Sequence, residues 1–318
     1  MTSTTDSEPR RARPHLVWWD RLRIAAAFDV TYFHMQLTHG LFGIGLPTFL
    51  LLATGLPSRR VRETPLGDYA RHRAGRTIRP WIFYFFLYGA LRALAEWKNG
   101  RPPLAWWEPT MLLYGPQENL WFLPFIFVLG LAANRVHALT LRFDTLKLAA
   151  GLCALGLGTC LLQLLPAHPT PFHQWRFALP ALPFGLALGA FDRARAEGRR
   201  RGAALLCLAL LGALLVLALL FRDTGLGQLA LRYAMAMGLV ILGEAFPGEK
   251  DRLTAGLSDV AFGIVMLAPL VHLFVVRRVF GRLGLDGADH AAAAAWLSFL
   301  ATGALAYALR RTPARAIL

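Results

Sequence analysis

Long apolar segments recur along this chain and constrain its fold more than any other feature. A hydrocarbon core of about 30 Å is crossed by a helix of roughly 20 apolar residues. Segments near that length lie at about 22–37, 40–57, 80–96, 119–134, 146–165, 176–191, 203–221, 227–246, 258–276 and 290–309. Within a bilayer, helices satisfy their own backbone hydrogen bonds. The sequence therefore predicts an all-α protein, a polytopic transmembrane helix bundle of about ten helices.

The composition agrees with a chain that uses lipid as its solvent. Of its 318 residues, 56% are hydrophobic and only 17% are charged, which is too few charges to cover a soluble globule. The net charge of +15 would suggest nucleic-acid binding if the cations gathered on an accessible face. They occur instead in short blocks between apolar segments, as topology signals do. We expect the lipid bilayer as a partner and no nucleic acid.

The same blocks of Lys and Arg predict the orientation of the chain. If the N-terminus is cytoplasmic, the inside connections hold most of these cations, and the main exception is the cluster Arg277, Arg278 and Arg282. Both termini are therefore predicted to be cytoplasmic, in an integral membrane protein that we expect in a bacterial inner membrane. We divide the chain into a disordered basic cytoplasmic tail (1–15), a transmembrane domain (16–310) and a short cytoplasmic tail (311–318).

Ionisable residues interrupt the first apolar segment. Asp20, Arg21, Arg23, Asp29 and His34 lie in or beside it, and each costs free energy in lipid unless it faces a partner or a water-filled cavity. Arg23 and His34 are eleven residues apart, which places them on nearly the same helical face and roughly 16 Å apart along the axis. They could mark two depths of one channel. Alternatively, Arg21 and Arg23 only anchor the helix among the lipid headgroups.

A second group of cations precedes the third apolar segment. Arg73, Arg76 and Arg79 recur every third residue in the loop after the second span, so they share a face if that stretch is helical. A row of guanidinium groups can hold phosphate oxygens in bidentate fashion. The alternative is a topology signal that lies against anionic lipid.

Taken together, these residues resemble the acyltransferase 3 family of integral membrane O-acyltransferases. Asp20, Arg23 and His34 look like its first-helix signature, and Arg73, Arg76 and Pro80 are similar to its paired-arginine motif. Further matches lie at Gly45–Gly55, Leu120–Pro124, Pro183–Gly189 and Phe262–Pro269.

The sequence departs from the family in the last of these motifs. The usual histidine before the proline is replaced by Ala268, and His272 follows three residues after Pro269. The sequence therefore has no histidine at the position where the family has its late one.

The resemblance implies an acyl-CoA donor, commonly acetyl-CoA, that is used at the cytoplasmic side, and an acceptor hydroxyl on a carbohydrate or glycosylated product. It implies His34 as the catalytic residue, with Arg23 and Asp20 beside it in the first-helix signature. Arg73, Arg76, Arg79 and Arg21 are the expected ligands of the CoA phosphates, and no metal is expected.

The residue types fit acyl transfer. An imidazole has an unperturbed pKa of about 6.5, which suits a base that removes the proton of an acceptor hydroxyl. Asp29 lies some 140° around the helix from His34 and is poorly placed to orient it. The sequence does not separate direct transfer from an acyl-histidine intermediate. A different class of protein, a transporter or flippase with an Arg23, Asp29 and His34 path, also agrees with buried ionisable groups.

Overall fold

The computed structural model describes residues 17–34, 43–59, 65–140, 142–166, 169–243, 251–285 and 290–318, and within these ranges it contains helices and no strand. The α-helices are α1 (Val17–His34), α2 (Gly45–Arg59), α3 (Leu66–Lys98), α4 (Met111–Tyr114), α5 (Phe122–Thr140), α6 (Thr145–Leu161), α7 (Phe172–Ala178), α8 (Ala181–Ala196), α9 (Arg200–Leu220), α10 (Gly225–Gly243), α11 (Arg252–Val271), α12 (Arg277–Arg282) and α13 (Ala291–Leu309). Shorter elements are the 3₁₀-helices η1 (Glu118–Trp121), η2 (Leu162–Leu164) and η5 (Pro313–Ile317) and the π-helix η3 (His272–Val276). The predicted all-α class is confirmed.

Among the described residues, six helical stretches are long and apolar enough to cross a membrane, so the predicted count of ten spans is approximate. They are Asn119–Val136, Thr145–Leu164, Arg200–Leu220, Gly225–Gly243, Arg252–Arg282 and Ala291–Leu309. The predicted tail at 1–15 lies outside the described residues, and the predicted orientation of the termini stays a prediction.

The outer surface of α9 shows that lipid is the solvent of this fold. Leu219 and Leu220 are 74% and 72% exposed, and Leu205 and Leu208 are both 66% exposed. Large apolar side chains at this density on one helix would face water at a high cost. In a bilayer the same surface meets acyl chains, which agrees with an integral membrane protein.

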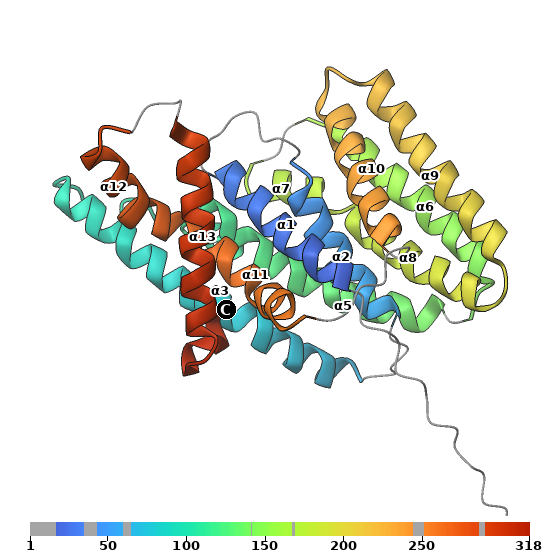
Figure 1. Cartoon of the computed structure of the whole chain (residues 1–318). Coiled ribbons are helices and arrows are strands. Elements are labelled where there is room, and N and C mark those ends of the chain that lie inside the picture. Colours follow the sequence, from blue (N-terminus) through green and yellow to red (C-terminus); the bar gives the residue numbers. More distant parts are fainter. Residues whose placement is uncertain are drawn as a thin grey trace, which may run out of the picture.

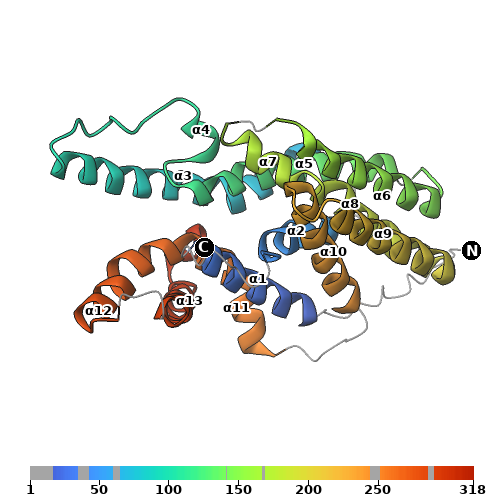
Figure 2. The ribbon, with the colours of Figure 1, turned by 90° about the horizontal axis from the view of Figure 1, so that it is seen from above.

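The helices fall into two groups that meet at the centre of the molecule. Helices α6, α8, α9 and α10 lie together on one side (Figure 1), and α1, α11, α12 and α13 gather on the other. The view from above places α3 and α5 along one edge, opposite α1 and α11, with α2 lying between (Figure 2). Helix α2 packs on α1, α5, α8 and α10 and so joins the two groups.

Helix α3 differs from its sequence-based expectation. The stretch with Arg73, Arg76 and Arg79 was expected as a loop before a span at 80–96, but α3 runs without a break from Leu66 to Lys98. At 1.5 Å per residue, its 33 residues extend about 50 Å, well beyond the ~30 Å of hydrocarbon. Its first half is therefore a cationic helix that continues into an aromatic one. Pro80 lies inside the helix at the junction, where its ring leaves the carbonyl of Arg76 without an intrahelical donor.

Small residues allow close packing between α2, α6 and α8. A Cβ on Gly156 of α6 would lie 2.1 Å from the ring of Phe184 in α8, and a Cβ on Gly185 would lie 1.8 Å from Thr54 Oγ1 in α2. Thr54 donates a hydrogen bond of 2.9 Å to the carbonyl of Ala181. Glycine at helix contacts lets backbones approach, which is how membrane helices gain packing energy.

Two aspartates set where α6 and α11 begin. Asp144 accepts hydrogen bonds of 3.1 Å from the backbone N–H groups of Leu146 and Lys147, and Asp251 accepts one of 2.6 Å from Thr254. Each carboxylate thereby satisfies N–H groups that the first turn of a helix leaves free. Asp144 also pairs with Arg199. The hydrogen bond from Arg199, together with that from Lys147 N–H, holds the pKa of Asp144 below its ordinary value.

Candidate active site

A large cavity lies among α1, α2, α3, α5 and α11, and the segment after α13 forms part of its wall. Its volume is about 980 Å³, at the upper end of the ~300–1,000 Å³ typical of small-molecule sites. The charged residues in its lining are Arg23, Arg73, Arg76, Arg310, Arg315, Asp20 and Asp259. Arginines outnumber aspartates, so the cavity is cationic and suits a ligand that carries several negative charges.

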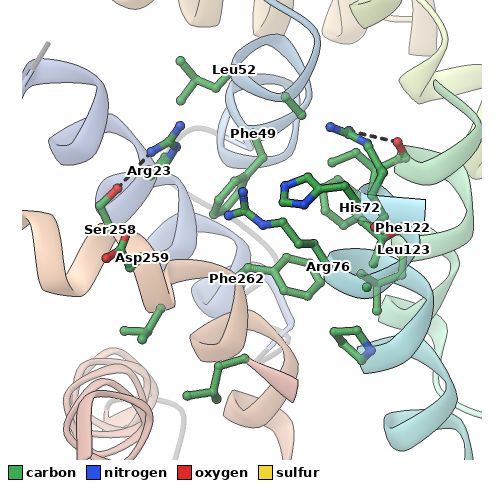
Figure 3. A pocket seen from close by; sticks show the side chains of 18 of the residues that line it. Arg23, Phe49, Leu52, His72, Arg76, Phe122, Leu123, Ser258, Asp259 and Phe262 are labelled. Atoms are coloured by element: carbon green, nitrogen blue, oxygen red, sulfur yellow. Dashed lines mark hydrogen bonds between the residues drawn. The ribbon is translucent and has the colours of Figure 1, made fainter. Parts of the chain in front are cut away.

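The α1 side of the cavity holds a small network of polar side chains. Asp20 is buried at 4% exposure, and its Oδ1 accepts a hydrogen bond of 2.7 Å from Ser258 Oγ of α11. Arg23 Nη1 lies 3.2 Å from both Asp20 Oδ1 and Ser258 Oγ and donates to them. The Arg23 guanidinium is thus fixed between two helices at the cavity edge (Figure 3).

Arg73 enters the cavity from α3 and is held by α5. Its Nη2 donates to the carbonyl of Ile126 at 3.1 Å, and its Nη1 lies 3.4 Å from Tyr69 Oη. A Cβ on Gly130 would lie 2.2 Å from Arg73 Nε, so the absence of a side chain there makes room for the guanidinium. Arg73 Nε itself is buried and has no hydrogen-bond partner in the described structure. A buried donor without a partner is costly, and an anionic ligand would satisfy it.

Arg76 lies one helical turn after Arg73 and is exposed within the cavity lining. Its side chain extends toward the middle of the cavity, and His72 lies beside it (Figure 3). No ion pair to Arg73 or Arg76 is present among the described residues. By contrast, Arg310 donates to Asp259 at 3.1 Å.

Three phenylalanines from different helices form an apolar wall. Phe49 of α2 and Phe122 of α5 have ring centroids 6.4 Å apart, and Phe122 stacks on Phe262 of α11 with centroids 6.0 Å apart. All three rings line the cavity (Figure 3). The lining therefore combines cations with an apolar surface, as a site for an amphipathic ligand requires.

His34 lies elsewhere. It is the last residue of α1, and it is absent from the cavity lining in the part of the chain that the structure describes. Its half-buried ring meets the ring of Phe33 edge-on, with centroids 5.7 Å apart. Eleven residues of helix separate His34 from Arg23, or roughly 16 Å along the axis. The structure thus brings Asp20, Arg23, Arg73 and Arg76 together and leaves His34 at the other end of α1.

Two more predicted phosphate ligands lie outside this cavity. Arg21 and Arg79 are both exposed, and neither is among the described residues that line it. The structure therefore does not bring these two arginines to the cavity with Arg73 and Arg76.

The remaining intramembrane candidates have structural partners. Asp29 Oδ2 accepts a hydrogen bond of 2.7 Å from Gly45 N and so connects α1 to the start of α2. His272 begins the π-helix η3, and its Nδ1 lies 3.0 Å from Ser298 Oγ of α13.

Comparison with protein families decides the class of this protein. Residues 16–311 match the family model described as an acyltransferase domain. The chain belongs to the acyltransferase 3 family. Since the match covers nearly the whole chain and includes the spanning helices, the protein is a membrane acyltransferase. No curated protein and no solved structure matches it.

Several residues that the sequence analysis does not single out line the cavity. Ser258 and Asp259 appear in the sequence only as polar residues near the start of an apolar segment, and Arg310 and Arg315 only as topology signals. His72 lies inside the arginine block itself. His72 lies four residues before Arg76, a spacing that places the two side chains on one helical face, so it could have been found from the sequence. The other four residues reach the cavity only through tertiary packing.

Proposed function

We propose that this acyltransferase moves an acetyl or other short acyl group from acyl-CoA to a hydroxyl of a carbohydrate or glycosylated acceptor. The cationic cavity is the observation that carries the donor half of the proposal. CoA bears a pyrophosphate and a third phosphate on a nucleotide, and guanidinium groups without carboxylate partners are the side chains that bind such groups best. The acceptor half is supported by the family resemblance.

Arg73 and Arg76 are the proposed ligands of the pyrophosphate. They lie one turn apart on α3, and the unpartnered Nε of Arg73 supports an anion at this position. Arg23 is proposed to bind the same group from α1. Asp20 then acts as a positioning residue, because with Ser258 it fixes the Arg23 guanidinium. Arg21 and Arg79, outside the lining, would attract the donor at longer range, an effect that salt screens.

His34 is the proposed catalytic base. The imidazole removes the proton of the acceptor hydroxyl, and the hydroxyl oxygen forms a bond to the thioester carbonyl carbon. The carbon–sulfur bond breaks, the proton passes to the leaving sulfur, and CoA departs as the thiol. A single arginine cannot contact both the phosphates and a reacting centre at His34, because Arg23 is roughly 16 Å away along α1. The pantetheine arm of the donor must cover that gap.

Acetyl-CoA and the purified protein in detergent test the proposal. With water in place of the acceptor hydroxyl, acetyl-CoA is hydrolysed to acetate and free CoA thiol. We expect this rate to fall by about 10²- to 10⁴-fold in His34→Ala, the range that a general base contributes. His173→Ala is the matched control, because His173 is an exposed histidine on α7. An unchanged rate in His34→Ala would remove His34 from its role. Complete absence of acetyl-CoA turnover would reject acetyl-CoA as the donor of this acyltransferase.

A further inference from the structure

The segment Thr312–Leu318 follows the acyltransferase match, which ends at residue 311. Even so, Arg315, Ala316 and Leu318 of this segment line the cationic cavity. The cavity wall therefore includes residues that the family pattern does not cover. Such a segment can add donor contacts that are particular to this chain.

Local hydrogen bonds and apolar packing hold the segment in place. Thr312 Oγ1 accepts a hydrogen bond of 3.2 Å from Ala314 N, and this cap starts η5. Helix η5 packs on α3 and α13. Leu318 is half-buried against α11, where a Cβ added to Gly263 would lie 2.8 Å from Leu318 Cδ2. The segment thus connects α3, α11 and α13 around the cavity.

Arg315 differs from its neighbour Arg310 in its charge environment. Arg310 pairs with Asp259, whereas the described structure shows no ion pair at Arg315. The side chain of Arg315 is also exposed. By contrast, Arg73 of α3 is half-buried and donates a hydrogen bond to a carbonyl of α5. Arg315 therefore contributes an exposed guanidinium to the cavity lining, and no ion pair among the described residues neutralises it.

We infer that Arg315 binds the 3′-phosphate on the nucleotide end of acyl-CoA, an inference that rests on the donor site proposed above. The acyl end of the donor must point toward His34, so the nucleotide end stays at the exposed side of the cavity. The pyrophosphate is then left to Arg73 and Arg76. Arg73 and Arg76 lie on α3 and Arg315 lies on η5. This separation matches that between the pyrophosphate and the 3′-phosphate of CoA, which are attached to different carbons of the ribose.

The test measures binding of CoA and of 3′-dephospho-CoA to the full-length protein by calorimetry. In Arg315→Gln, we expect the Kd for CoA to rise about five- to tenfold, as for one partly exposed charge-assisted pair, and the Kd for 3′-dephospho-CoA to stay unchanged. In Arg73→Gln, both ligands should bind more weakly. Gly263→Ala should reproduce the Arg315→Gln pattern, because the added methyl group displaces Leu318 without changing any charge.

Arg311→Gln is the matched control, since Arg311 is exposed, lies against the Tyr307 ring and is not in the lining. An equal loss of affinity for CoA and for 3′-dephospho-CoA in Arg315→Gln would overturn the inference. No change in affinity for either ligand would also overturn it. In both of those cases the proposed function survives if Arg73→Gln weakens CoA binding. Absence of CoA binding to the unmodified protein would instead reject the donor site as a whole.

Discussion

Around the cavity, long cationic side chains from α1 and α3 occupy the space between helices. Between α2, α6 and α8, glycines bring one helix directly against the side chains of another. A Cβ on Gly130 would meet the flexible end of Arg73, whereas a Cβ on Gly185 would meet Thr54 close to the backbone of α2. Glycine therefore makes room for a guanidinium group at the cavity, whereas between α2, α6 and α8 it allows the helices to pack closely.

Because of this difference, we expect substitutions around the cavity to change CoA binding and substitutions between α2, α6 and α8 to change the free energy of unfolding. A change at Gly130, Arg73 or Arg76 removes or moves a charge that takes part in no ion pair among the described residues. A change in the packed region adds volume where no space remains. Variants of the two regions should therefore fail in different measurements.

The largest effect on stability is expected from Gly185→Ala. The added methyl group would overlap Thr54 Oγ1, break its hydrogen bond to Ala181 and push α2 away from α8. We expect the free energy of unfolding to fall by about 1–3 kcal/mol, measured by thermal denaturation in detergent. CoA affinity of the folded fraction should not change.

Gly158→Ala is the control, because a Cβ at Gly158 meets no atom within 4 Å. If Gly185→Ala were as stable as Gly158→Ala, the packed region would not be packed as described.

Gly130→Ala should show the opposite pattern. Its methyl group would displace the Arg73 guanidinium, whose Nε lies 2.2 Å from the added position. A misplaced ligand costs on the order of tenfold in CoA affinity, with little change in melting temperature because an arginine can swing aside. Gly151→Ala, with no atom within 4 Å of its added Cβ, provides the comparison. Loss of stability without loss of affinity would erase the distinction between the regions.

The smallest effect on stability is expected at Asp144, the charged residue that caps the start of α6. The pKa of Asp144 is lowered, so its contribution to stability is present above the unfolded-state pKa of about 3.9 and is lost as pH falls through the folded-state pKa. Asp144→Ala should lower the melting temperature by on the order of 1 °C at pH 7.

The difference between Asp144→Ala and the unmodified protein should shrink as pH falls below about 4. Asp223→Ala, at an exposed pair with Arg222, should cause no comparable shift. A pH-independent difference at Asp144 would show that its carboxylate charge is not what stabilises α6.

The helical class and the pairing of Asp20 with Arg23 were accessible from the sequence for physical reasons. Apolar length alone predicts helices in lipid, and Asp20 and Arg23 are one turn apart, so their pairing follows from helix geometry. The three-residue spacing of Arg73 and Arg76 likewise anticipated a shared face, although the stretch was expected as a loop. Hydropathy does not predict that α3 begins at Leu66, because the stretch before Pro80 is cationic and lacks the apolar pattern that marks a span.

The rest of the cavity could not be predicted because it depends on contacts between distant parts of the chain. Ser258 meets Asp20 across 238 residues of sequence, and Arg315 reaches the cavity because η5 packs on α3. Neither contact has a periodic signal. The position of His34 relative to the cavity also depends on how α1 is placed among its neighbours, which helix geometry alone does not give.

The dependence of CoA binding on salt concentration tests whether Arg73 and Arg76 bind the phosphates of the donor. The unmodified protein should bind CoA with an affinity that falls as ionic strength rises. Arg73→Gln and Arg76→Gln should each raise the Kd by about tenfold or more and flatten that salt dependence. Arg71→Gln, on the same helix and paired with Asp68 outside the lining, should bind as the unmodified protein does. Equal CoA affinity in all four proteins would show that neither Arg73 nor Arg76 binds those phosphates.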